Sequence, residues 1–407
     1  MTGRTKILNA SISNVLAMTG GWLAYNSGPL LRIPEAINGD WAHIYLSPVQ
    51  LAMAGIILLV IAWRMSIHSR LFAWFTLFAW HIGAGSAIPS GWAQFFGNDF
   101  GWIAWVIWAA IASTPALFFP TKFAPYALAA GSVMTALTPI GMMNPLLAST
   151  VFWPAGGWLA IALAIGILIL PSIKSEKAFV LIGIIIIAFG IFMNARYDAK
   201  DRRPPATTHA ITTYEGRHSN LAINWFGRQG RISRQAKDDI ESGAKLVVTP
   251  EGTVDKWDVW AAAVWRHAKS AAAEKGSMLL VGVYVEQNGR WQDGLLDIVN
   301  NKLYSASVPM PISMWNPFGK EHYPLALENL PKLIETPVGK AAYIICYEEM
   351  LIWPLAVKAG FSSPDFIISA ANQWFTTGES GTAESQKRSF DFQTRLWGLP
   401  AIRAVNW

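Results

Sequence analysis

Two apolar runs in the C-terminal half of the chain end on side chains that could carry out covalent catalysis. The run Leu246-Val-Val-Thr-Pro-Glu251 ends on a carboxylate, and the run Tyr343-Ile-Ile-Cys346-Tyr-Glu348 contains the single cysteine of the chain. A cysteine beside a carboxylate base can lose its proton and attack an acyl carbon, which gives a thioester that a second nucleophile resolves. Glu251 and Cys346 are therefore candidates for a base and a nucleophile.

Each of the two residues also has a purely structural explanation. A lone cysteine at the end of an apolar strand is more often inert core packing than a nucleophile. A glutamate that follows Val-Val-Thr-Pro is often a charge at a helix N-terminus. The spacing by itself therefore leaves catalysis the minority hypothesis.

The elements around these runs alternate between strand and helix patterns. Short apolar runs predict strands at residues 210–214, 245–249, 278–285, 294–299, 341–346 and 365–369. Helical patterns lie between them, at residues 229–242, 254–275 and 350–359. This alternation predicts a layered α/β domain, whose strands present reacting groups at their C-terminal ends.

The N-terminal half has a composition suited to a different solvent. The chain has 407 residues, of which 53% are hydrophobic and 14% charged, whereas about a quarter of an ordinary soluble chain is charged. A membrane span needs about 20 apolar residues. Seven segments meet or nearly meet this length, at residues 12–31, 43–63, 71–88, 102–119, 123–143, 151–170 and 178–194.

Lys and Arg are distributed unequally between alternate loops of these spans. One set of loops holds Arg4, Lys6, Arg64, Arg70, Lys122, Lys174 and Lys177, and the other set holds Arg32 before the soluble domain. Because cytoplasmic loops carry the excess of basic residues, we expect a cytoplasmic N-terminus and a periplasmic soluble domain. Arg196, Lys200, Arg202 and Arg203 follow the last span and argue mildly against this orientation.

The charge pattern bears on the classes of partner and cofactor. The net charge is +6, but the one basic cluster, at residues 196–203, follows a membrane span and is typical of a juxtamembrane segment rather than a nucleic-acid site. His81 lies within a span, where a neutral histidine bonded to a neighbouring helix is the favoured explanation. The seven histidines show no ligand spacing and there is one cysteine, so no metal and no cofactor are expected.

Four motifs in the second half resemble the carbon–nitrogen hydrolase (nitrilase) superfamily. Pro250-Glu251 is similar to its first signature, Cys346-Tyr-Glu348 to its nucleophile signature, Ala371-Asn372-Gln-Trp374-Phe to its Asn-Asp-x-Trp-Phe, and Pro400-Ala-Ile-Arg403-Ala-Val-Asn406 to its Pro-x-x-Arg-Ala-x-Asn. Their order agrees over residues 206 to 407. The resemblance implies an αββα sandwich with Cys346 as nucleophile and Glu251 as base. It also implies that Glu348, Asn372, Trp374 and Glu321 line a substrate pocket, and that Glu348 helps to hold the site.

The chain departs from the superfamily pattern at two places. The superfamily uses a lysine to stabilise the oxyanion, and no lysine lies at the expected distance from Pro309 or Pro317. Lys302 is the nearest candidate for this catalytic role, and Lys320 is another. The last strands of the superfamily have no counterpart after Trp407.

Within the superfamily, the membrane branch that includes apolipoprotein N-acyltransferase is similar in having membrane helices before the enzyme-like domain. The divergent segment from Val308 to Trp315 and the short length resemble more closely the TraB family of plasmid conjugal transfer proteins. The resemblance implies an inner-membrane protein with amide or acyl-transfer chemistry, whose partners are the bilayer, an acyl-chain or lipoprotein-like substrate and conjugation proteins. The alternatives are an inactive scaffold of the conjugation apparatus and an apolipoprotein N-acyltransferase.

The sequence therefore predicts three parts. Residues 1–195 form a membrane domain of about seven helices, residues 196–205 a linker that contains Pro204 and Pro205, and residues 206–407 a nitrilase-like domain that lacks its last strands.

Overall fold

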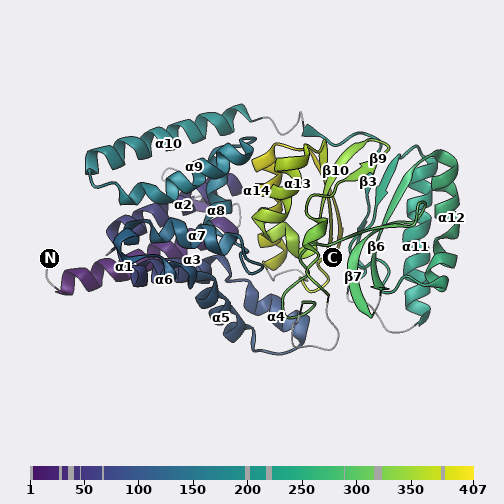
Figure 1. Ribbon diagram of the computed structural model, residues 1–407, viewed down its shortest axis with the longest axis horizontal. Helices are drawn as coiled ribbons and strands as arrows, with labels where there is room; N and C mark the ends of the chain where they lie inside the picture. Colours follow the sequence, from purple (N-terminus) through teal and green to yellow (C-terminus); the bar gives the residue numbers. More distant parts are fainter. Residues whose placement is uncertain are drawn as a thin grey trace. The chain divides into compact units, whose positions relative to one another are not determined.

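The computed structural model describes residues 3–26, 30–34, 41–45, 47–66, 68–197, 202–216, 222–287, 289–315, 323–376 and 381–407. The chain forms two compact units (Figure 1). The first consists of Met1–Tyr197 and Ser380–Trp397, and the second of Asp198–Glu379 and Gly398–Trp407. The predicted domain limits differ from this division in two respects. The segment Ser380–Trp397 belongs to the first unit, and the predicted linker 196–205 is divided between the two units after Tyr197.

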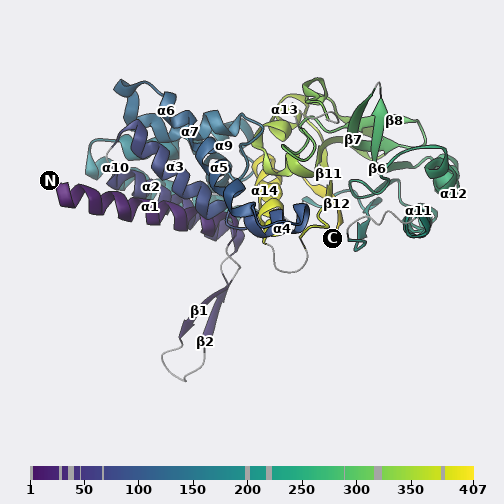
Figure 2. The ribbon, with the colours of Figure 1, turned by 90° about the horizontal axis from the view of Figure 1, so that it is seen from below.

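The first unit is built from helices. They are α1 (Gly3–Tyr25), α2 (Pro48–Met65), α3 (Arg70–Ala84), α4 (Ile88–Phe96), α5 (Gly101–Ser113), α6 (Pro115–Phe118), α7 (Ala127–Ala136), α8 (Pro145–Ser149), α9 (Gly157–Ile169), α10 (Glu176–Arg196) and α14 (Thr382–Trp397), with short 3-10 turns η1 (Thr121–Tyr126), η2 (Thr150–Phe152) and η3 (Leu170–Ser172). Helices α1, α2 and α3 pack side by side (Figure 2).

Between α1 and α2 the structure has an antiparallel hairpin of β1 (Leu30–Pro34) and β2 (Trp41–Tyr45). The predicted helical segment 12–31 was therefore wrong at its C-terminal end, and the segment 43–63 was wrong at its N-terminal end. Helix α2 begins later because Ser47 caps it: the Ser47 hydroxyl accepts from the Gln50 amide over 3.3 Å, and Pro48 occupies the first turn. Serine at the cap and proline in the first turn are strong start signals for a helix.

Fewer helices satisfy the criteria for a membrane span than the seven that we predicted. Among the described residues, α2, Gly101–Phe118 and α10 are long and apolar enough, and two bent pairs raise the number to five. These pairs are Arg70–Ala84 with Ile88–Phe96, bent by 58°, and Pro145–Phe152 with Gly157–Ser172, bent by 111°. The predicted span 123–143 fails because its helix, α7, is only 10 residues long.

Hydrogen bonds nevertheless identify two opposite ends of the first unit. At one end the bonds are Arg64 to the carbonyls of Pro171 and Ile173, Arg70 to Leu117, and the Trp63 indole and Ser172 hydroxyl to Pro125. At the other end they are the Tyr25 hydroxyl to Asn144, the Trp80 indole to Met143, and the Asn194 amide to Val151. Arg64, Arg70 and the segments next to Lys122 and Lys174 thus share one end, and α10 ends at the other.

Helix α14 is held among the helices of the first unit by polar contacts. The Ser385 hydroxyl donates to the carbonyl of Tyr25 and lies 2.9 Å from the side-chain oxygen of Asn26. The buried Arg388 donates to the carbonyl of Leu23, and Arg395 to the side chain of Asn194. A segment that the sequence assigned to the α/β domain is therefore part of the helical unit.

The second unit contains two mixed five-stranded sheets. The first has the order β3 (Thr208–Ala210), β5 (Leu246–Val248), β6 (Met278–Gln287), β7 (Arg290–Asp297) and β8 (Lys302–Ser305). The second has the order β4 (Thr212–Thr213), β12 (Ala401–Asn406), β11 (Phe366–Asn372), β10 (Gly339–Ile345) and β9 (Ile334–Thr336). The predicted strand 210–214 is wrong as one element, because its residues divide between β3 and β4 in different sheets.

The two sheets face each other across a shared apolar core. Alternate residues of β5 and β10, such as Leu246, Val248, Tyr343 and Ile345, point into this core because strand side chains alternate between faces. Helices α11 (Ala222–Glu241) and α12 (Val259–Lys275) cover the other face of the first sheet (Figure 1). Helix α13 (Ile352–Ser362) packs against β10. This is the αββα layering that the sequence predicted.

Candidate active site

The candidate residues follow the C-terminal ends of strands, as expected for an α/β fold. Glu251 lies three residues after β5, and Cys346 directly follows β10. Asn372 ends β11 and Asn406 ends β12, which is parallel to β11, as β11 is to β10. Because β10, β11 and β12 are parallel in the second sheet, their C-terminal ends lie at one edge of that sheet. Glu251 comes from the end of β5 in the first sheet, which faces the second.

Glu251 and Cys346 meet at this edge. The thiol and the carboxyl group form a hydrogen bond with each other. The backbone amide of Asn372 donates to Glu251 Oε2 over 2.9 Å and also lies in hydrogen-bonding reach of the sulfur. The Tyr284 hydroxyl is 3.5 Å from Glu251 Oε1. The structure thus brings together the two side chains on which the chemical hypothesis depends.

Cys346 has a backbone conformation that is typical of a tight turn. Its φ is +45°, in the left-handed region that non-glycine residues rarely adopt, and it opens the 3-10 turn η6 (Cys346–Met350). Such conformations persist only where the surroundings impose them, and they cluster at functional sites. The turn points the sulfur at the carboxyl group of Glu251 instead of continuing strand β10.

Glu348 secures this turn through its carboxylate. Its Oε2 accepts from the Ile345 amide over 2.9 Å, and its Oε1 accepts from the amides of Ser307 and Val308 over 2.8 and 3.2 Å. The side chain is fully buried. The sequence placed Glu348 among substrate-binding residues, whereas its oxygens here face backbone amides on both sides of the site.

A second carboxylate of η6 is held by an ion pair. Arg403 on β12 donates to both oxygens of Glu349, over 2.6 and 2.8 Å, and the Ser369 hydroxyl on β11 lies 2.5 Å from the same carboxylate. Bidentate pairs of this kind fix geometry as well as charge. The cysteine turn is therefore fastened to the two neighbouring strands.

Glycine makes room for the segment that carries Glu251. A Cβ atom at Gly282 on β6 would lie 1.9 Å from the carbonyl oxygen of Pro250. Only glycine permits so close an approach of two backbones. Gly282 is therefore required for Glu251 to cross the end of β6.

Sequence reasoning missed a third carboxyl group in the site, Asp293 on β7. Asp293 is 4% exposed, pairs in register with Tyr284 on β6, and hydrogen-bonds to Glu251. The signal was present in the sequence, because Asp293 lies two residues before Leu295 and strand periodicity puts both on the buried face. Our predicted strand began at residue 294, whereas β7 begins at Arg290, so Asp293 was left out.

Burial and neighbouring acids raise the pKa values of the central groups. Burial, followed by the charge of Glu251, raises the pKa of the Cys346 thiol well above 9.0. Burial also raises the pKa of Glu251, and it raises that of Asp293 well above 3.8. Although Cys346 keeps some exposed area, its sulfur lies among these buried groups. A resting thiol is therefore favoured over a thiolate.

The catalytic lysine of the resemblance is not supplied by Lys302. Lys302 is exposed at the start of β8, with its ammonium 5.0 Å above the Tyr304 ring. Ala306, four residues further on, contacts the backbone of Asp293, so Lys302 lies about 13 Å from that end of the strand.

The remaining predicted residues have mixed outcomes. The Asn372 side chain accepts from Asn406 over 2.9 Å, so Asn372 meets Glu251 through its backbone amide. The Trp374 ring packs edge-on against Phe375. Glu321 and the alternative lysine, Lys320, lie outside the described residues. Within the described residues, no group of three or more His, Cys, Asp or Glu could hold a metal ion.

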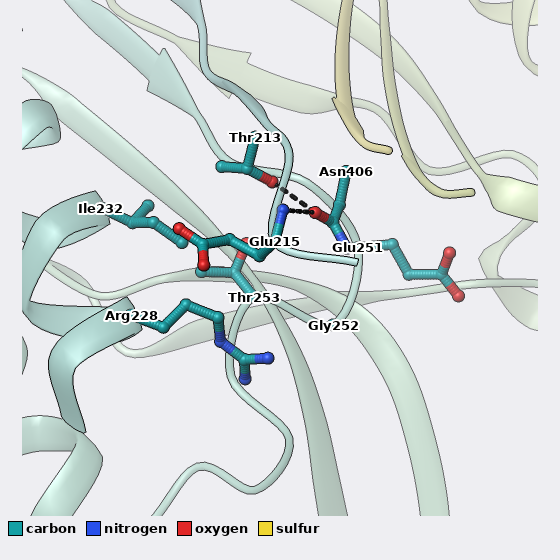
Figure 3. A pocket seen from close by; sticks show the side chains of 8 residues that line it. All are labelled: Thr213, Glu215, Arg228, Ile232, Glu251, Gly252, Thr253 and Asn406. Atoms are coloured by element: carbon teal, nitrogen blue, oxygen red, sulfur yellow. Dashed lines mark hydrogen bonds between the residues drawn. The ribbon is translucent and has the colours of Figure 1, made fainter. Parts of the chain in front are cut away.

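A small pocket lies next to the backbone of Glu251 and the side chain of Asn406. It is lined by Thr213, Glu215, Arg228, Ile232, Glu251, Gly252, Thr253 and Asn406. Figure 3 shows that the Glu251 carboxyl group points away from the other side chains, and that the Asn406 oxygen accepts from the Thr213 hydroxyl and the Glu215 amide. This pocket is therefore separate from the Glu251 and Cys346 contact.

No protein-family model matches the chain. The chain is 24% identical over 378 residues to the conjugal transfer protein TraB of Agrobacterium fabrum, covering 84% of this chain and 85% of that protein. It is 22% identical over 404 residues to the probable conjugal transfer protein TraB of Sinorhizobium fredii, covering 93% and 97%.

Among solved structures, two mutant forms of an amidase of the nitrilase superfamily from Nesterenkonia align with this chain. One has a TM-score of 0.35 and 12% identity over 49% of this chain and 74% of that one. The other, in complex with acrylamide, has a TM-score of 0.34 and 12% identity over 50% and 78%. The predicted resemblance to the TraB family is confirmed in the sequence comparison: over most of its length, the chain is similar to conjugal transfer proteins named TraB.

Proposed function

We propose that this protein is a membrane-bound carbon–nitrogen hydrolase-like enzyme of plasmid conjugal transfer that performs amide or acyl-transfer chemistry. The observation that carries the proposal is the hydrogen bond between the Cys346 thiol and the Glu251 carboxyl group at the strand ends. In the first half-reaction the sulfur attacks the acyl carbon, and Glu251 takes the thiol proton. The carbon–leaving-group bond then breaks, the leaving group takes a proton from Glu251, and a thioester remains on Cys346.

In the second half-reaction an amine or water attacks the thioester. Glu251 takes the proton of this nucleophile, and the sulfur leaves and recovers a proton. The Asn372 amide, which reaches both Glu251 and the sulfur, is suited to holding these two groups in register. We propose no role for Lys302, because it lies at the far end of β8.

The membrane role rests on the helices of the first unit and on the names of the relatives. Three to five described segments are long and apolar enough to span a bilayer, and similar proteins are named for conjugal transfer. Arg64, Arg70 and the segments beside Lys122 and Lys174 share one end of the unit, and α10 ends at the other. This supports an inner-membrane protein whose basic end is cytoplasmic and whose second unit is periplasmic.

An acyl-chain or lipoprotein-like substrate suits a domain that is tethered beside the bilayer, and conjugation proteins are the proposed protein partners. The location can be tested with reporter fusions after Arg196 and after Arg64. A periplasmic reporter should be active in the first fusion and silent in the second. The reverse pattern would overturn the proposed orientation.

Acyl-enzyme formation tests the chemistry. Full-length protein in detergent is treated with p-nitrophenyl esters of short and long acyl chains, and the intact mass is followed over time. Because the chain has one cysteine, a single acyl adduct should appear in the wild type and be absent from Cys346→Ala. Glu251→Gln should slow acylation about 100-fold or more, as expected for loss of a general base.

The matched control is Glu286→Gln on β6, a carboxylate that is 44% exposed and paired with Lys256. It should acylate at the wild-type rate. If the adduct forms equally fast in wild type and Glu251→Gln, Glu251 is not the base. If an adduct forms on Cys346→Ala, Cys346 is not the nucleophile.

One observation favours a second function, that of an inactive scaffold of the conjugation apparatus. Burial and the neighbouring carboxyl groups of Glu251 and Asp293 raise the pKa of the Cys346 thiol, and Lys302 lies at the far end of β8. A preorganised oxyanion donor is worth about 3 kcal/mol in such reactions. Plasmid transfer in a strain with Cys346→Ala separates the two functions, because a scaffold would support transfer at the wild-type frequency whereas an enzyme would not.

A further inference from the structure

Two buried carboxyl groups lie in direct contact in the site. Glu251 and Asp293 are each 4% exposed, and their carboxyl groups lie within hydrogen-bonding reach of each other. Asp293 points between the sheets, on the same face of β7 as the buried Leu295. Two ionised carboxylates have no hydrogen to place between them, so this contact requires one proton. The pair therefore carries one negative charge when the contact is made.

We propose that Asp293 is a positioning residue that shares one proton with Glu251 and so maintains Glu251 as the ionised base facing the Cys346 thiol. The inference rests on the proposed function, because it describes how the base of that reaction is kept ready. Asp293 acts through Glu251, whose ionised oxygens can accept from the Asp293 O–H, the Cys346 S–H and the Asn372 N–H.

The surroundings explain why a shared proton is needed. The ionisable groups that act on the pair are Tyr284 from β6, Cys346, Glu348 and Glu349 from η6, and Tyr284 in turn meets Tyr323. Arg403 is bound to Glu349, and the buried Lys358 lies on the Tyr343 carbonyl beside Glu348. The groups that act most strongly on the pair are therefore acids and phenols, and these two cations are bound to other groups.

Of the two acids, Asp293 is the better holder of the proton. Burial and the charge of Glu251 both raise its pKa, whereas donors from Cys346, Asp293 and Asn372 oppose the rise at Glu251. One oxygen of Asp293, Oδ1, has no hydrogen-bond partner within the described structure. A neutral carboxyl group tolerates such an unpaired oxygen better than a charged one.

Infrared spectroscopy detects the shared proton directly. Full-length protein in detergent at neutral pH should show the C=O band of a protonated, buried carboxylic acid. The band should be absent from Asp293→Asn. Asp297→Asn is the matched control, because Asp297 is an equally buried aspartate of the same strand whose oxygens bond to the Val299 and Asn300 amides. A band that survives in Asp293→Asn, or no such band in the wild type, would overturn the proposal.

The pH profile of Cys346 alkylation gives a functional readout. Iodoacetamide forms an S–C bond with the single thiol, iodide leaves, and the thiol proton passes to Glu251. In Asp293→Asn the amide still donates to Glu251, so the acid limb of the profile should stay in place. In Asp293→Ala the donor is lost, so the limb should move to higher pH and alkylation on that limb should slow about tenfold or more.

An acid limb that moves to lower pH in Asp293→Ala would mean that Asp293 is charged, which contradicts the proposal. An equal loss of rate at all pH values would mean a purely structural role. These outcomes are independent of acylation. If the ester assay fails but the infrared band appears as expected, the proposed function is contradicted and the shared proton is not. If acylation occurs but the band is absent, only the shared proton is contradicted.

Discussion

Removal of the Arg403 guanidinium is expected to destabilise the second unit strongly. Arg403 binds both oxygens of Glu349, whose side chain is 0% exposed, while Arg403 itself is 13% exposed. Arg403→Met leaves the carboxylate in the interior without its counter-ion. Loss of one partner of a buried pair costs about 3–5 kcal/mol.

This cost can be measured as a melting temperature. About 1 kcal/mol corresponds to roughly 2–4 °C for a unit of this size, so Arg403→Met should melt roughly 6–20 °C below the wild type. Tryptophan fluorescence during heating of the full-length protein in detergent reports the transition. The control is Lys256→Met, which breaks an exposed pair with Glu286 at 3.4 Å and should cost at most about 1 kcal/mol.

The double variant Arg403→Met/Glu349→Leu separates charge from packing. If the cost arises from an uncompensated charge, the double variant should melt above Arg403→Met, because apolar replacement of both partners is often close to neutral. A melting temperature of Arg403→Met within the range of Lys256→Met would refute the reasoning. So would a double variant that is less stable than the single one.

Three further outcomes are expected. Gly282→Ala should prevent normal folding, because its Cβ would lie 1.9 Å from a backbone oxygen. The control is Gly230→Ala on α11, whose Cβ would meet nothing within 4 Å. Its free energy of unfolding, measured in urea, should increase by about 1 kcal/mol. Burial lowers the pKa of Lys358 from 10.5, so the unfolded chain binds more protons than the folded one between the folded-state pKa and 10.5. The free energy of unfolding should therefore rise with pH in this range, and the rise should be absent from unfolding curves of Lys358→Met. Arg388→Met, which removes a fully buried arginine from α14, should increase proteolysis of the first unit, whereas the exposed Lys387→Met should leave it unchanged.

The candidate site was largely accessible from the sequence because its members follow strand ends. Glu251 and Cys346 each end an apolar run, and the Asn372 and Arg403 motifs identify the strands beside them. Asp293 was missed because a single carboxyl group in a mixed strand looks like a solvated residue until the burial of its face is known. Lys302 was chosen by its distance in sequence, but strand β8 directs it away from the site.

Some parts of the fold were predicted from the sequence and others were not. The order of strands and helices in the second unit follows from hydrophobic periodicity, but the division of residues 210–214 between β3 and β4 does not. The hairpin of β1 and β2 interrupts what apolar composition alone suggested to be helix. Composition also predicted more spans than the three to five candidates among the described residues, since hydropathy does not register the break at Phe123 and Pro125 that leaves α7 short.

The sequence by itself determined the apolar and polar halves, the strand ends that carry Glu251 and Cys346, and the resemblance to conjugal transfer proteins. These are local properties of composition, periodicity and motif. The tertiary structure decided that Glu251 has Asp293 rather than a described lysine as its neighbour, that Glu348 and Glu349 hold the cysteine turn, and that α14 packs among the helices of the first unit. Such outcomes depend on which strand edges and helix faces meet, and the energy of those long-range contacts is not encoded in any single segment.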